Sequence, residues 1–61
     1  MQASIKIDMG NAAFENSPSS EVARILRELA DKVEDRGVSI GDGIKLYDVN
    51  GNNVGQFEVT K

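Results

Sequence analysis

Residues 17–38 read SPSSEVARILRELADKVEDRGV, and this stretch contains the start, the stop and the buried side of one helix. Ser17 is suited to cap the helix, since its hydroxyl can accept a hydrogen bond from an amide of the first turn. Pro18 fits the first helical position, where its missing N–H costs nothing. At the other end, Gly37 can take the left-handed conformation while Val38 folds back on the last turn, as in a Schellman closure.

Apolar residues recur within the stretch at spacings of three and four, which predicts an apolar stripe along one side of the helix. The stripe consists of Val22, Ile25, Leu26, Leu29, Ala30 and Val33. Opposite charges four residues apart occupy the other side, as in Arg24 with Glu28, Arg27 with Asp31, and Glu28 with Lys32. Such pairs are typical of a solvated helix surface, so the stripe is the side that needs a sheet to cover.

The segment before the helix alternates between apolar and polar residues, which predicts a half-buried strand over residues 4–9. Its apolar side carries Ile5, Ile7 and Met9. Residues 10–16 are rich in Gly and Asn and are expected to form a loop. Phe14 is the exception in that loop, and we expect this aromatic to plug the end of the core.

Residues 44–59 predict a β-hairpin, because Asn50-Gly51 tolerates the positive φ angles of a type I′ turn. A two-residue loop sets Ile44 opposite Phe57, and a four-residue loop keeps the same parity. A three-residue loop would place the apolar residues of the first strand opposite polar ones, so it is disfavoured. The expected core side of the hairpin is Ile44, Leu46, Phe57 and Val59.

These elements predict an α+β fold of type β-α-β-β, as one domain over residues 1–61. Strand order 1-3-2 keeps every pair antiparallel, and one helix covers one face. The alternative places strand 1 beside strand 2 as a parallel pair with a right-handed crossover. The hairpin register puts Tyr47, Val49 and Val54 together on the face without a helix. That group is read either as part of a solvated face or as a candidate interface, and an exposed strand edge is the alternative contact surface.

Composition narrows the classes of function. With 61 residues the chain buries only about 60% of its unfolded surface, so a monomer is marginal. Cys and His are both absent, which removes disulfides and the usual zinc ligands as sources of stability. Self-association is the remaining source, and we expect a homodimer.

The net charge of −3 disfavours direct nucleic-acid binding, which needs clustered Lys and Arg to neutralise phosphates. The alternative function is a nucleic-acid-associated regulator, or one whose acidic surface imitates nucleic acid. No apolar run approaches the about 20 residues that span a membrane. The first residues lack the pattern of a signal peptide, so we expect a cytoplasmic protein.

No motif predicts catalysis, a cofactor or a metal. Residues 48–52, DVNGN, superficially resemble a calcium loop, but the EF-hand needs Gly at position six and Glu at position twelve. Counted from Asp48, the glycine is fourth and the twelfth residue is Val59, so an Asx-supported turn is the better interpretation. Without His or Cys, no arrangement of an activated nucleophile and its base is recognisable. We therefore expect a protein that is not an enzyme.

Four segments carry a resemblance to a known group of proteins. They are residues 5–15 (IKIDMGNAAFE), 21–30 (EVARILRELA), 46–52 (LYDVNGN) and 54–55 (VG). Together they resemble small hypothetical proteins common in tailed-phage and prophage genomes, over nearly the whole chain. The resemblance implies an accessory gene product inside a bacterial host cell, which acts by binding a host or phage protein, and it transfers no functional residue.

Overall fold

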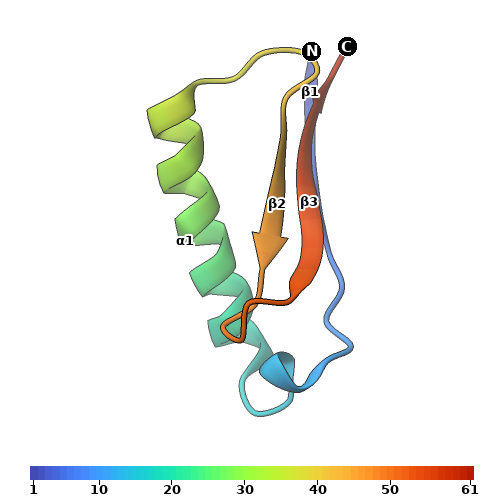
Figure 1. Cartoon of the computed structure of the whole chain (residues 1–61), viewed down its shortest axis with the longest axis vertical. Coiled ribbons are helices and arrows are strands. Elements are labelled where there is room, and N and C mark those ends of the chain that lie inside the picture. Colours follow the sequence, from blue (N-terminus) through green and yellow to red (C-terminus); the bar gives the residue numbers. More distant parts are fainter.

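One helix packs on one face of a three-stranded antiparallel sheet in the computed structural model, which describes residues 1–61 (Figure 1). The elements are β1 (Gln2–Ile7), the short 3-10 helix η1 (Ala12–Phe14), α1 (Pro18–Arg36), β2 (Gly43–Tyr47) and β3 (Asn53–Thr60). β3 lies in the middle and pairs antiparallel with both neighbours. The predicted β-α-β-β order and the 1-3-2 sheet are confirmed.

The ends of α1 lie where the sequence places them, but neither closes as expected. Pro18 is the first helical residue, yet the hydroxyl of Ser17 donates to the Ser20 hydroxyl (2.8 Å) and accepts no backbone amide. Gly37 has φ 78° and donates its N–H to the Val33 carbonyl. Its ψ of −177° leads the chain away extended, so the Schellman closure is not formed and Val38 stays exposed.

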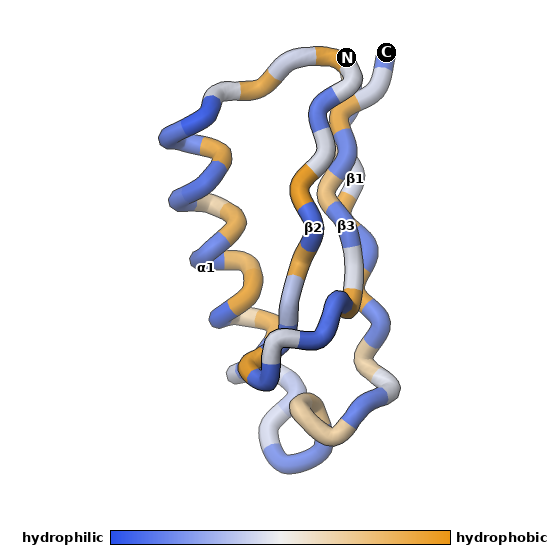
Figure 2. The backbone as a smooth tube through the Cα atoms, viewed as in Figure 1, coloured by the Kyte–Doolittle hydropathy of each residue, from blue (hydrophilic) through white to orange (hydrophobic).

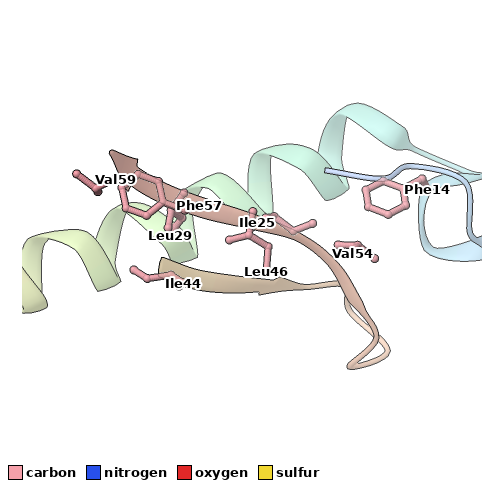
Figure 3. Packing of buried hydrophobic residues seen from close by; sticks show 8 residues of the cluster. All are labelled: Phe14, Ile25, Leu29, Ile44, Leu46, Val54, Phe57 and Val59. Atoms are coloured by element: carbon pink, nitrogen blue, oxygen red, sulfur yellow. The ribbon is translucent and has the colours of Figure 1, made fainter. Parts of the chain in front are cut away.

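The core lies between α1 and the sheet, and Figure 2 shows apolar segments on the side of α1 that faces the strands. Eight buried apolar residues form it: Phe14, Ile25, Leu29, Ile44, Leu46, Val54, Phe57 and Val59. The predicted core side of the hairpin is confirmed in full. Phe14 closes the end of this cluster, as predicted, and η1 presents it there (Figure 3).

The apolar stripe of α1 is narrower than the spacing predicts. Ile25 and Leu29 are buried, and Val22 and Val33 pack against the core from its margin. Leu26 is 40% exposed because it lies on the flank of the helix, at the margin of the covered side. That flank is open, and it contributes to the surface considered next.

Candidate interaction surface

The predicted group of Tyr47, Val49 and Val54 does not form one patch. Tyr47 is 44% exposed and Val49 is 65% exposed, but Val54 is only 6% exposed and belongs to the core. Figure 3 shows Val54 between Phe14 and Leu46 in the buried cluster. The placement of Val54 on the outer face is therefore wrong.

The cause is a three-residue hairpin loop compensated by a β-bulge. Asp48 donates its N–H to the Asn52 carbonyl, which leaves residues 49–51 as the loop. Leu46 still pairs with Gly55, whereas Tyr47 pairs with Asn53, so Val54 is the extra residue of β3. Its insertion turns the Val54 side chain to the inner face and restores the parity that a three-residue loop alone would lose.

The turn itself differs from the expected type I′. Gly51 has φ 86°, as predicted, but no residue other than glycine has a positive φ, so Asn50 does not meet the type I′ requirement. The Gly51 N–H donates to the Asp48 carbonyl at 3.0 Å. A β-turn followed by a glycine with positive φ is the usual form of a three-residue loop.

Two buried carboxylates hold this loop against the helix. Glu21 accepts hydrogen bonds from the Val49 amide (2.8 Å) and from two guanidinium nitrogens of Arg24 (2.8 and 3.0 Å). The hydrogen bonds from Arg24 lower the pKa of Glu21, burial opposes them, and the Val49 amide adds to the lowering. Arg24 also pairs with Glu28, as predicted, and donates to the Tyr47 carbonyl (3.1 Å).

Asp48 is the second carboxylate, and it organises the turn from inside. One of its oxygens accepts from the amides of Asn50 and Asn52, and the other from the side-chain amides of Asn11 and Asn52. Burial raises the pKa of Asp48, but these hydrogen bonds outweigh burial and leave its pKa below the ordinary value. The predicted Asx-supported turn is confirmed, and every buried side-chain polar atom has a partner.

Apart from Tyr47 at the end of β2, the outer face of the sheet is polar. Its strands alternate, so the face opposite the helix carries Ser4, Lys6, Lys45, Gln56 and Glu58. A shallow hollow of about 460 Å³ lies over β1 and β3, and seven of its eight lining residues are not hydrophobic. This face is typical of the solvated side of an antiparallel sheet.

The inner side of β1 is the apolar surface that sequence reasoning missed. Ile5 pairs with Phe57 and so points to the helix side of the sheet, yet it is 47% exposed, whereas Phe57 is buried. The reason is that α1 packs closest to β2, at the opposite edge from β1. Leu26 on the flank of α1 and Met9 after β1 are exposed to a similar extent. Arg24 reaches Tyr47 of β2, and Leu26 lies about 200° round the helix from Arg24, so Leu26 lies on the flank of α1 away from β2. We call Ile5 and Leu26 the open side.

The structure brings together no group of three or more His, Cys, Asp or Glu side chains that could hold a metal ion. Neither of its helices combines the length and the apolar character needed to cross a membrane. Comparison with protein-family models, with curated proteins and with solved structures finds no match for this chain.

Proposed function

We propose that the protein is a small non-catalytic accessory protein of the phage or prophage type, which acts in the cytoplasm of a bacterial host by binding another protein. The observation that carries this proposal is the open side. Large apolar side chains that are nearly half exposed, next to a covered core, are typical of protein-binding surfaces.

Two exposed apolar surfaces compete for the role of contact surface. Tyr47 ends β2 and Val49 begins the hairpin loop, but with Val54 buried they have lost the third member of the predicted patch. Ile5 instead pairs with the core residue Phe57, and Leu26 follows the core residue Ile25 along α1. A partner that covers Ile5 and Leu26 would therefore extend an apolar layer already present. A contact of this kind resembles the apolar centre of an interface, and we place the binding surface on the open side.

Site-specific photo-crosslinking tests this proposal in the cell that carries the gene. A photoreactive amino acid replaces Leu26 in one variant and Arg27 in the control, which lies one position along the same helix on its charged side. We expect a discrete adduct with another protein from position 26 and none from position 27. The adduct should disappear when Ile5→Lys is added, because the charge lies in the same surface.

Two outcomes would contradict the proposal. Equal adducts from positions 26 and 27 would show that the open side is not the contact surface. The absence of any adduct at position 26 other than one between two copies of the chain would remove the accessory role.

A further inference from the structure

We propose that β1 pairs with β1 of a second copy of this chain, antiparallel and about a two-fold axis that passes beside Ile5. The two sheets would then form one continuous six-stranded sheet in the order 2-3-1-1-3-2, with both helices on the same face. This inference goes beyond the proposed function, because it names a self-association that sets two open sides next to each other.

The backbone of β1 offers unpaired groups along its free edge. Val59 of β3 accepts from the Gly41 amide and donates to the Asp42 carbonyl, so its backbone groups point towards the β2 side. The backbone N–H and C=O groups of its neighbour Glu58, which pairs with Ser4, therefore point towards β1. Because successive residues of a strand alternate in this way, the residues of β1 that pair with Val59, Phe57 and Gly55 direct their N–H and C=O groups outwards. These residues are Ala3, Ile5 and Ile7.

The other edge of the sheet is protected. β2 has five residues, and the register shift beside Tyr47 interrupts its pairing with β3. The guanidinium of Arg24 donates a hydrogen bond to the Tyr47 carbonyl at 3.1 Å. A short strand and a charged side chain laid over the edge are among the usual means of preventing edge pairing. β1 has six residues with no bulge and no proline, so it is the edge that remains available.

The side chains of β1 select one register. With Ile5 opposite Ile5 of the second copy, Ala3 lies opposite Ile7, and all of these residues have the outward-facing backbone groups that a ladder needs. On the outer face Ser4 then lies opposite Lys6. A shift that puts Lys6 on the axis would oppose Lys6 with Lys6, which is unfavourable for like charges. A shift that puts Ser4 on the axis would leave Ile7 without a partner in β1, so only the register with Ile5 on the axis uses all three outward-facing residues of each strand. Register with Ile5 on the axis also keeps the open sides of both copies on one face.

The surface area and the shape of the chain both indicate that the helix does not cover the whole sheet. The chain exposes 4313 Å², whereas a compact monomer of 6.6 kDa exposes about 3900 Å². Its radius of gyration is 11.9 Å, against about 10.5 Å for a compact domain of this length. The excess of about 400 Å² is half of the about 800 Å² that each partner contributes to a standard interface. The excess indicates surface left uncovered, and the free edge of β1 beside it is what favours a second copy as the occupant.

Proline variants at the two edges test the choice of edge by sedimentation equilibrium, up to hundreds of micromolar. Ile5→Pro removes an N–H that points outwards, so the monomer keeps its pairing with β3 while the dimer loses a ladder bond from each copy. We expect its dissociation constant to rise by about tenfold or more. Lys45→Pro removes an outward N–H of β2 in the same way and should leave the dimer unchanged.

Charged variants at position 5 test the register without altering the backbone. Ile5→Lys and Ile5→Glu should each be monomeric, because like charges would face each other across the axis. An equal mixture of the two should associate, because the charges are then opposite. This rescue requires position 5 to face itself, and a monomeric mixture would overturn the proposed register. It also keeps the test valid if Ile5→Pro does not fold.

Two further outcomes of these measurements would also overturn the proposal. A wild-type mass of one chain at all concentrations would overturn the proposal, and so would a dimer that Tyr47→Asp dissociates and Ile5→Pro does not. The second result would place the contact on the outer face. Neither result affects an adduct between position 26 and another protein, so failure of the dimer is distinguishable from failure of the proposed function.

Discussion

Gly55 is the position where the smallest substitution should have the largest effect on the fold. A Cβ at this residue would lie 1.9 Å from the Lys6 carbonyl oxygen, 2.9 Å from the Lys6 carbonyl carbon and 3.0 Å from the Ile7 Cα. All three atoms belong to the backbone of β1, so no side-chain rotation relieves the overlap. β1 would have to move by more than 1 Å to restore a contact of 3.0 Å.

The magnitude follows from what that movement breaks. Overpacking a core by a methyl group costs about 1–3 kcal/mol where side chains can adjust. Here the strands themselves must separate, so Gly55→Ala should lose about 3 kcal/mol or more. A domain of this length has a total stability of about 3–9 kcal/mol. The variant is therefore expected to be largely unfolded, or to melt about 15 °C or more below the wild type.

Thermal melts followed by circular dichroism provide the assay, with Gly43→Ala as the matched control. Gly43 lies in β2 opposite Glu58, and its added Cβ would lie 3.2 Å from the side-chain nitrogen of Gln56 and at an ordinary contact distance of 3.7 Å from the Phe57 carbonyl oxygen. That side chain can move, so the control should melt within a few degrees of the wild type. If Gly55→Ala melts as high as Gly43→Ala, the close approach of β1 to the bulge is wrong.

The core, the turn and the buried carboxylates each give a further prediction. Leu29→Ala should cost about 2–5 kcal/mol and abolish cooperative unfolding, and a melting temperature near that of the wild type would show that Leu29 does not face the core. Gly51→Val should destabilise the protein far more than Asn53→Val, because Gly51 has a positive φ and Asn53 does not; melts that rank the two variants the other way would contradict this placement of the turn. The folded pKa of Asp48 is lowered, so its stabilisation is complete above the unfolded-state pKa near 4 and is lost as the pH falls through the folded value. The melting temperature should drop as the pH falls below about 5, and Asp48→Asn should make that drop smaller; an equal drop in the variant would show that Asp48 does not contribute.

The helix and the core of the hairpin could be predicted because each rests on a local and redundant signal. Pro18 and Gly37 mark the ends of α1 independently of its apolar spacing. Ile44 and Phe57 lie on the correct face because parity within a strand is set by alternation alone. These features depend on residues close in sequence, where backbone geometry leaves few alternatives.

The bulge was missed because hairpin parity was counted as if both strands were regular. The sequence does contain a signal, since a glycine inside a strand often marks a bulge or a close backbone approach. Gly55 is such a glycine, and it follows Val54 directly. If Gly55 is taken as the mark of a bulge, a three-residue loop becomes compatible with the apolar pattern and Val54 falls in the core.

The open side could not be predicted from periodicity. Alternation shows that Ile5 points to the helix side of the sheet, but it does not show which strands the helix covers. That choice depends on Glu21 and Arg24, which tie α1 to the hairpin loop beside β2. Both residues read as ordinary members of a charged helix surface, and only the fold shows that Glu21 is buried.

An isotope-filtered NOE spectrum tests the central claim, that the protein works through the uncovered side and free edge of β1. The sample is an equal mixture of labelled and unlabelled chains at a concentration where sedimentation shows dimers. Pairing of β1 with β1 predicts contacts between copies that join Ile5 to Ile5 and Ala3 to Ile7. Contacts between copies that involve Tyr47 or Val49, with none from β1, would contradict it.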